Sequence, residues 1–288
     1  MNQPESTKTF KPHQALAPTP QLYNELVGDG TEKLASATVA EIAFPSGSVI
    51  LDIGCGTGAG TAAIVDSLGG DAAGNISIKG VDINDDVLAF YKSKTAENRW
   101  PAEAIKADAG NLETIADATF THTIATMALF TFPDDGVPAA KEIYRTLKPG
   151  GVAMINSWAQ TSNMGPLRAA STRTRPEGAP GIRDAMAKWE DGEYLKSIIE
   201  KGGFAKDKIV LTKRDVYIRA TTIDRFALML WSFIGGTTAA GWIESDEERW
   251  DEAIVIIKDE LRKTDGFTEL EDGKMILKFV ANIAVATK

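Results

Sequence analysis

The sequence has very few of the residues that build metal centres and covalent cross-links. Its 288 residues include one cysteine, Cys55, and two histidines, His13 and His122. A lone cysteine cannot form a disulfide within the chain, and these three residues are too few for a zinc site of nitrogen and sulfur ligands. A triad of serine, histidine and aspartate would need a histidine, yet His122 lies in an expected strand and His13 in an expected tail. We therefore expect no metal and no hydrolase of this type.

Positive charge is in the minority, and long apolar runs are missing. The chain has 31 Lys and Arg residues against 40 Asp and Glu, which gives a net charge of -9. A basic surface is needed to bind a nucleic-acid backbone, so we expect a small-molecule substrate and no nucleic-acid partner. No apolar stretch reaches about 18 residues, and none resembles a signal peptide. These absences predict a cytoplasmic protein without a membrane partner.

The order of sequence patterns indicates one domain preceded by a short arm. Residues 1–20 are polar, contain four prolines and lack periodicity, so we expect a flexible N-terminal arm there. With 43% hydrophobic residues, the rest of the chain can bury one sizeable core. We expect a single domain over residues 21–288, with lid elements at 21–44, 160–190 and 221–264.

Alternating strand and helix patterns predict the fold. Apolar runs followed by helical patterns or turns indicate parallel strands joined by right-handed crossovers. Two late strands, 208–218 and 274–286, are expected to pair antiparallel at the sheet edge, and residues 162–181 to form a basic loop. The prediction is an α/β protein with a Rossmann-like, doubly wound, seven-stranded, mainly parallel sheet, an antiparallel final strand and a helical lid. The expected parallel strands cover residues 49–52, 75–83, 102–108, 120–130 and 152–158, and the expected helices 61–70, 84–100, 137–147, 191–204, 221–235 and 246–263.

A glycine-rich turn and three strand-end acids indicate a nucleotide-like ligand. Gly54, Gly56, Gly58 and Gly60 follow the first strand and lack the side chains that would keep a ligand away from the backbone. Ligands of doubly wound sheets bind at the carboxyl ends of the strands, where Asp52, Asp82 and Asp108 are expected. Asp82 can accept hydrogen bonds from both hydroxyls of a ribose, and Asp108 one from an adenine amino group, with Ile83 and Ala109 packed on the ring. Acidic residues also end strands as ordinary helix caps, and Asn84 is expected to be the cap of the next helix.

These motifs together resemble those of the class I S-adenosylmethionine-dependent methyltransferases. The segments LDIGCGTG at 51–58, VDIN at 81–84, KAD at 106–108 and LKPGG at 147–151 carry the resemblance, which covers residues 45 to 160 and extends to about 218. It implies S-adenosyl-L-methionine as cofactor, the turn against its methionine part, Asp82 at the ribose and Asp108 at the adenine. Met127, Ala128 and Leu129, at the end of the fourth expected strand, would line the methyl-donor side. The predicted cofactor-binding residues are Tyr23, Asp52, Ile53, Gly54, Cys55, Gly56, Gly58, Asp82, Ile83, Asn84, Asp108, Ala109, Met127, Ala128 and Leu129.

A weaker similarity connects the chain to fungal small-molecule methyltransferases of secondary metabolism, including those that methylate sulfur in dithiol natural products. It is carried by FTHTIATMALFTFPD at 120–134, by the NSW strand end at 156–158 and by the chain length. Those enzymes often have an asparagine and alanine pair where this chain has Ile53 and Gly54. The similarity therefore leaves the subgroup and the substrate open.

The same residues also bear on rival functions. A nicotinamide dehydrogenase would place a pyrophosphate at the glycines, where the charge of Asp52 is unfavourable and a cationic sulfonium and ammonium cofactor fits better. The chain also lacks a Tyr-x-x-x-Lys pair of the kind that short-chain dehydrogenases use. Two further alternatives are an enzyme that uses the same cofactor for chemistry other than methylation, and a partner protein that binds the cofactor without catalysis.

The acceptor side is less visible in the sequence. Methyl transfer needs alignment and desolvation rather than a dedicated acid or base, so no catalytic residue is assigned and His122 is expected to lie away from the cofactor. The scarcity of histidine favours a sulfur, nitrogen or acidic oxygen acceptor. Cys55 is expected to be a packing residue, and the basic run Arg168, Arg173 and Arg175 a solvated loop. The predicted substrate-binding residues are aromatic, namely Trp158, Trp231, Phe233 and Trp242, and their alternative role is ordinary packing.

Overall fold

The fold is that of a computed structural model, which describes residues 10–69, 75–179, 187–233 and 241–288. Contacts within the chain divide it into two compact units. We call residues 30–160, 186–216 and 280–288 the sheet unit, and residues 1–29, 161–185 and 217–279 the helical unit. Each is described by itself. The predicted single domain and its lids stay predictions, and parts of the arm and of the predicted lids, at 1–9, 180–186 and 234–240, lie outside the described residues.

The sheet unit is built on parallel strands in a doubly wound order. The strand order is β3-β2-β1-β4-β5-β8-β6, with β7 paired to β8; β6 and β8 each include residues of both units, and β7 belongs to the helical unit. Neighbouring strands from β3 to β5 pair parallel, and β8 pairs antiparallel with β5. The order reverses between β1 and β4, which is the switch point where ligands of such sheets bind. The predicted fold class is confirmed. The strands are β1 Val49–Ile53, β2 Ser77–Asp82, β3 Ala102–Lys106, β4 Phe120–Ala125, β5 Leu147–Gln160, β6 Ile209–Thr222, β7 Thr268–Glu269 and β8 Lys274–Thr287.

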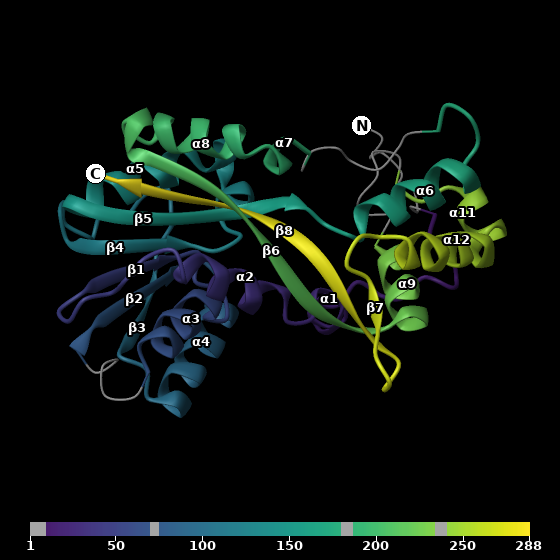
Figure 1. The fold of residues 1–288 in the computed structure, drawn as a ribbon, viewed down its shortest axis with the longest axis horizontal. Coiled ribbons are helices and arrows are strands. Elements are labelled where there is room, and N and C mark those ends of the chain that lie inside the picture. Colours follow the sequence, from purple (N-terminus) through teal and green to yellow (C-terminus); the bar gives the residue numbers. More distant parts are fainter. Residues whose placement is uncertain (1–9, 70–74, 180–186, 234–240) are drawn as a thin grey trace, which may run out of the picture. The chain divides into compact units, whose positions relative to one another are not determined.

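Helices cover both faces of this sheet (Figure 1). Side chains of β1 alternate between the two faces, so Ile50 packs in one apolar cluster with Val39 and Ile64, whereas Leu51 packs in another with Ile143 and Ile198. The first cluster contains residues of α2 Gly30–Val39 and α3 Ala59–Leu68, and the second residues of α5 Val137–Thr146 and α8 Gly192–Lys201. Burial on both faces explains why the first strand is a continuous apolar run.

Local signals set the helix ends in the sheet unit. Helix α4, Asp85–Asn98, starts at the predicted cap, because Oδ1 of Asn84 accepts hydrogen bonds from the backbone N–H groups of Asp86 and Val87. Asp191 caps α8 in the same way through the N–H of Glu193. The remaining helical turns of this unit are η2 Leu129–Thr131, η3 Pro133–Gly136, α7 Ala187–Glu190 and η5 Lys206–Lys208.

The helical unit packs amphipathic helices against one another. Helix α12, Trp250–Arg262, contacts α6 and α9, and its buried residues Trp250, Ala253, Ile257 and Leu261 follow helical spacing. In the described part of the predicted arm, Nδ1 of His13 lies 2.6 Å from a carboxylate oxygen of Glu247. The other helices here are α1 Pro20–Val27, α6 Met164–Thr174, α9 Ile223–Ser232 and α11 Glu244–Glu248. Among the described residues, no helix has both the length and the apolar character needed to span a membrane.

Three predicted elements, and the predicted environment of one arginine, differ from the structure. Residues 164–174, predicted as part of a loop, form α6, whose first turn accommodates Pro166 because the N–H groups there have no helical partner anyway. Arg175, predicted in a solvated loop, is buried in an ion pair with Asp246, at 2.6 Å between Nη2 and Oδ2. The helix predicted at 246–263 breaks at Arg249. The strand predicted to end at residue 130 ends at Ala125.

Candidate active site

The glycine turn after β1 needs glycine at its bends. Gly54, Gly56 and Gly58 have φ values of +66°, +53° and +91°, in the left-handed region where a side chain is strained. A Cβ atom on Gly54 would lie 2.9 Å from the Cβ of Ala128, and one on Gly58 would lie 3.2 Å from the Trp100 ring. The turn therefore lies directly against the segment that follows β4.

Asp82 connects the glycine turn to the ends of β2 and β3. Its Oδ2 accepts a hydrogen bond from the N–H of Gly56 at 3.1 Å, and its Oδ1 accepts one from the N–H of Asn84 at 3.0 Å. Its backbone carbonyl accepts from the N–H of Ala107, just beyond β3. A carboxylate has about four lone-pair sites, so each oxygen can still accept a hydrogen bond from a hydroxyl group. The structure brings the predicted Gly56, Asp82 and Asn84 together.

Asp108 lies in a tight turn two residues beyond the end of β3. Its Oδ1 accepts from the N–H of Gly110 at 2.8 Å, and its carbonyl accepts from the N–H of Asn111 at 2.9 Å. The Asp108 side chain is exposed, and Ile83, beyond β2, is 64% exposed although it is apolar. Ala109 is buried and packs in the cluster of α5 and α8. Of the three residues predicted to contact an adenine, Asp108 and Ile83 are therefore exposed, and Ala109 is buried.

Asp52 points under the turn, at helix α3. Its side chain is buried, and its Oδ2 accepts hydrogen bonds from the N–H of Thr61 at 2.9 Å and from the Thr61 hydroxyl at 2.8 Å. The Thr61 hydroxyl also shares a hydrogen bond of 2.7 Å with the hydroxyl of Tyr91. Burial raises the pKa of Asp52 from 3.8 to about 6, although the Thr61 bonds oppose the rise. The predicted contact of this carboxylate with a cationic cofactor tail stays a prediction.

The segment after β4 is a turn and not the predicted strand end. Met127 has φ +52°, and Leu129 begins the 3-10 turn η2, so neither residue belongs to β4. The N–H of Met127 donates to Oδ1 of Asn156 at 2.9 Å, and Nδ2 of Asn156 donates to the hydroxyl of Thr38 in α2 at 2.8 Å. Ala128 and Leu129 are buried, whereas Met127 is half-buried. An amide buried in a strand thus holds the left-handed backbone of Met127.

The single cysteine and the strand histidine lie in places that suit packing. Burial, and the nearby charges of Asp52 and Asp82, raise the pKa of the Cys55 thiol, which disfavours a thiolate. His122 is 8% exposed, stacks at a tilt against Phe44 with ring centres 5.1 Å apart, and shares a hydrogen bond with Thr121. Burial lowers the pKa of His122. Within the described residues, no group of three or more His, Cys, Asp and Glu side chains is placed to hold a metal ion.

The predicted substrate-binding aromatics belong to different units. Trp158 lies in β5 of the sheet unit. In the helical unit, Trp231 is fully buried, Phe233 makes an edge contact with Tyr23, and Trp242 lies beside Trp250 with ring centres 6.0 Å apart. Tyr23, predicted to bind the cofactor, is 56% exposed. The roles of these residues stay predictions.

Sequence patterns missed the residues that support this site from beneath. Thr61, Tyr91 and Asn156 make the hydrogen bonds described above, yet none belongs to a motif that predicted a role. One signal was present for Asn156, because it is a polar residue that directly follows the apolar run VAMI at 152–155. Buried polar side chains next to such runs usually have specific partners.

The doubly wound sheet, the glycine turn at its switch point, Asp82 at the end of β2 and Asp108 just beyond β3 are the features expected of an adenosyl-type cofactor site. Residues 50–151 match the model of a family described as a methyltransferase domain. The chain is 31% identical over 134 residues to a demethylmenaquinone methyltransferase of Bacillus licheniformis, which covers 46% of this chain and 55% of that protein. It is 24% identical over 182 residues to the acetylaranotin bis-thiomethyltransferase of Aspergillus terreus, which covers 61% of each. The matches thus span little more than half of these relatives.

Solved structures show the same fold. The YcgJ protein of Bacillus subtilis matches with a TM-score of 0.53 and 15% identity, over 88% of this chain and 97% of that chain. A phosphoethanolamine N-methyltransferase 2 of Haemonchus contortus, in complex with phosphomonomethylethanolamine and S-adenosylhomocysteine, matches with a TM-score of 0.51 and 16% identity, over 93% and 56%. The cyclase SpnF also matches, with a TM-score of 0.51 and 18% identity, over 88% and 80%. Residues 50–151 therefore match a methyltransferase domain, and the relatives and solved structures that resemble the chain support a class I S-adenosylmethionine-dependent methyltransferase, whose cofactor is S-adenosylmethionine.

The residues present fit that cofactor. The turn has bare backbone at its bends, and Asp82 holds its carboxylate with spare acceptor capacity beside it. The exposed Ile83 and Asp108 offer an apolar surface and an acceptor near the ends of β2 and β3. We expect Asp82 to hold the ribose and the glycine turn to lie against the amino-acid part. When bound, the cofactor supplies a methyl group that is activated by a positively charged sulfur.

Proposed function

We propose that the protein transfers the methyl group of S-adenosylmethionine directly, by in-line displacement, to a sulfur, nitrogen or acidic oxygen atom of a small, partly apolar metabolite. One observation carries the proposal. Asp82 is held by the N–H groups of Gly56 and Asn84, so a single carboxylate is positioned by the glycine turn and by the end of β2. This arrangement is suited to a ribose next to a backbone that a ligand can approach closely.

The nature of the acceptor is proposed from the groups that lie around the turn. The turn's own thiol, that of Cys55, is buried and disfavoured as a thiolate. His122 lies within β4 and contacts Phe44 and Thr121, so it is engaged away from the strand's carboxyl end. An acceptor that needs no protein base, such as a thiol that is partly ionised at neutral pH, suits such a site best. The protein's contribution is then alignment and exclusion of water.

The cofactor part of the proposal is tested by calorimetry on variants of Asp82. Asp82→Ala removes the expected acceptor of both ribose hydroxyls and should weaken S-adenosylmethionine binding by roughly 2 to 4 kcal/mol, the scale for losing charge-assisted hydrogen bonds. Asp82→Asn keeps the shape and should lose less. Asp85→Asn is the matched control, because Asp85 lies three residues away, is 73% exposed and pairs with Lys106. Equal affinity of wild type and Asp82→Ala would contradict the assignment.

The chemistry is tested by the mass of the product. The protein is incubated with cofactor carrying a deuterated methyl group and with a panel of small aromatic thiols, amines and acidic phenols. A product heavier by one labelled methyl group supports methylation, and demethylated cofactor should form in equal amount. An isomeric product with the cofactor unchanged would instead identify an enzyme in which the sulfonium acts only as a charge. Binding of cofactor with no turnover of any panel member, and no acceptor-dependent loss of label, would favour a non-catalytic binding protein.

A further inference from the structure

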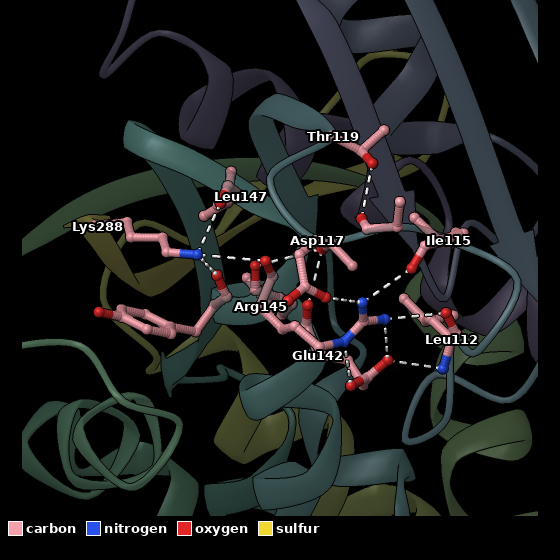
Figure 2. Close-up of polar contacts among 12 residues, drawn as sticks. Leu112, Ile115, Asp117, Thr119, Glu142, Arg145, Leu147 and Lys288 are labelled. Atoms are coloured by element: carbon pink, nitrogen blue, oxygen red, sulfur yellow. Dashed lines mark hydrogen bonds and ion pairs between the residues drawn. The ribbon is translucent and has the colours of Figure 1, made fainter.

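We propose that Glu142 and Arg145 of α5 are positioning residues for the adenosyl side of the cofactor site, because together they hold the loop that carries Asp108. The proposal rests on the proposed function and assigns a role to the helix that precedes the LKPGG segment. The two residues bond to the loop backbone at Leu112 and Ile115, beyond the turn at Asp108. They act on it through the backbone of the loop from residue 109 to residue 119 (Figure 2).

Glu142 and Arg145 form a two-point ion pair on one face of α5. Nε of Arg145 donates to Oε1 of Glu142 at 2.9 Å, and Nη2 donates to Oε2 at 2.7 Å. The side chain of Arg145 is only 30% exposed, and that of Glu142 only 16%. Hydrogen bonding to Arg145 also holds the pKa of Glu142 below its usual value. Such a paired fork is fixed in orientation, which a single lysine contact is not.

The pair uses its remaining hydrogen-bonding groups on the loop backbone. Oε2 of Glu142 accepts from the N–H of Leu112 at 2.8 Å, while Nη2 of Arg145 donates to the carbonyl of the same residue at 2.9 Å. Nη1 of Arg145 donates to the carbonyl of Ile115, also at 2.9 Å. Leu112 has no exposed surface, so its peptide groups have no solvent to replace these partners. Figure 2 shows the guanidinium facing the carbonyls of this loop.

The turn at Asp108 is joined directly to the part of the loop that is held. Asp108 closes the turn itself, through its hydrogen bonds with the N–H groups of Gly110 and Asn111, and Leu112 follows at once. Helix α5 also lies close to the turn through its first residues, because a Cβ on Gly110 would lie 3.2 Å from the Cβ of Pro138. Helix α5 therefore contacts the loop on both sides of Asn111.

Helix α5 is itself anchored, which makes it a firm reference for the loop. Nζ of Lys288 donates to the carbonyl of Tyr144, in the last turn of the helix, at 2.7 Å and to that of Leu147, just after the helix, at 2.8 Å (Figure 2). A Cβ on Gly202 would lie 2.7 Å from the Cβ of Ala140, so α8 packs closely on the same helix. Loss of the Glu142 and Arg145 pair should shift the loop relative to β2, and with it Asp108 relative to Asp82.

The test compares three variants of the full chain. Arg145→Lys keeps the charge but cannot contact both loop carbonyls, and Glu142→Gln keeps the shape but loses the charge. Asp117→Asn is the control: Asp117 lies in the same loop and pairs with Arg145 through a side chain that is 77% exposed, so its replacement leaves the hydrogen bonds of Arg145 to the buried loop carbonyls in place. Calorimetry measures the binding of S-adenosylhomocysteine and of S-inosylhomocysteine, which lacks the adenine amino group. The ratio of the two affinities reports whether Asp108 is in place.

We expect wild type and Asp117→Asn to prefer S-adenosylhomocysteine to the same extent, within about twofold. Arg145→Lys and Glu142→Gln should bind it about tenfold more weakly and lose most of that preference, with KM for the methyl donor raised and kcat nearly unchanged. If the two residues had a purely structural role, their variants would show a lower binding stoichiometry and a lower kcat, with the affinity and the preference intact. That result would overturn the proposal. A wild-type protein that binds both ligands equally would overturn it too, whereas one that binds neither would overturn the proposed function.

Discussion

Replacement of Asp52 by asparagine gives the sharpest test of the buried network beneath the glycine turn. The carboxyl group is 1% exposed, and its pKa rises from 3.8 to about 6 on folding because burial disfavours its charge. A carboxyl group whose pKa is raised binds protons in the folded state between these two pH values. Its contribution to stability is therefore complete below pH 3.8 and is lost as pH rises through about 6.

The size of the effect follows from the difference between the two pKa values. At 1.36 kcal/mol for each pKa unit, the rise corresponds to a loss of about 3 kcal/mol in the free energy of unfolding between low and neutral pH. An amide at position 52 carries no charge but can still accept the two hydrogen bonds from Thr61. Relative to wild type, Asp52→Asn should therefore gain about 3 kcal/mol between roughly pH 4 and pH 7.5.

Urea unfolding of both proteins at several pH values measures this difference directly. Asp66→Asn provides the control, because Asp66 lies in α3, the helix that contains Thr61, and is exposed, and because this substitution removes the same charge. The control should follow the pH dependence of wild type. If Asp52→Asn and wild type differ by the same amount at every pH, the carboxyl group does not titrate as argued, and the reasoning from burial is refuted.

Further expectations concern other parts of the chain. Lys288→Met removes the ammonium from three backbone carbonyls and should lower the free energy of unfolding by about 1–3 kcal/mol in urea; no change would show that water replaces these bonds. Asp246→Asn should lower the free energy of unfolding by about 3–5 kcal/mol, because it leaves the buried Arg175 without its charge partner. Asp246→Asn combined with Arg175→Met should recover part of that loss in the same assay. Asn156→Leu removes the acceptor of the Met127 N–H at a position with 1% exposure and should lower kcat at saturating cofactor at least about tenfold; an unchanged kcat would exclude a role for the Met127 backbone. Cys55 should react with a thiol reagent only as fast as the protein unfolds, and rapid labelling of the folded protein would contradict its burial.

Local patterns predicted the elements that depend on neighbouring residues. The apolar run before Asp52, the cap at Asn84 and the end of α5 near LKPGG each follow from short-range chemistry, and the structure has them where the sequence placed them. The end of β4 was misplaced because TMALF continues the apolar character of the strand. The left-handed turn at Met127 depends on Asn156, which lies in another strand.

The supporting residues of the site could not be predicted for the same reason. Arg145 is separated by about thirty positions from the loop carbonyls that it holds, and no local periodicity encodes such a contact. Arg175 and Asp246 are 71 positions apart and became a buried pair where the composition suggested a basic loop. Charged residues in polar segments usually face solvent, and only the folded chain reveals the exceptions.

The double attachment of Asp82 has a consequence for redesign of the site. The carboxylate that is proposed to recognise the ribose also receives the N–H groups of Gly56 and Asn84. Ligand preference and the conformation of the turn therefore cannot be varied separately at this position, and a library randomised there would change both together. Ile83 directly follows Asp82, its side chain is largely exposed, and as an apolar side chain it forms no hydrogen bond to the turn. Attempts to admit a cofactor with an enlarged base should begin at Ile83.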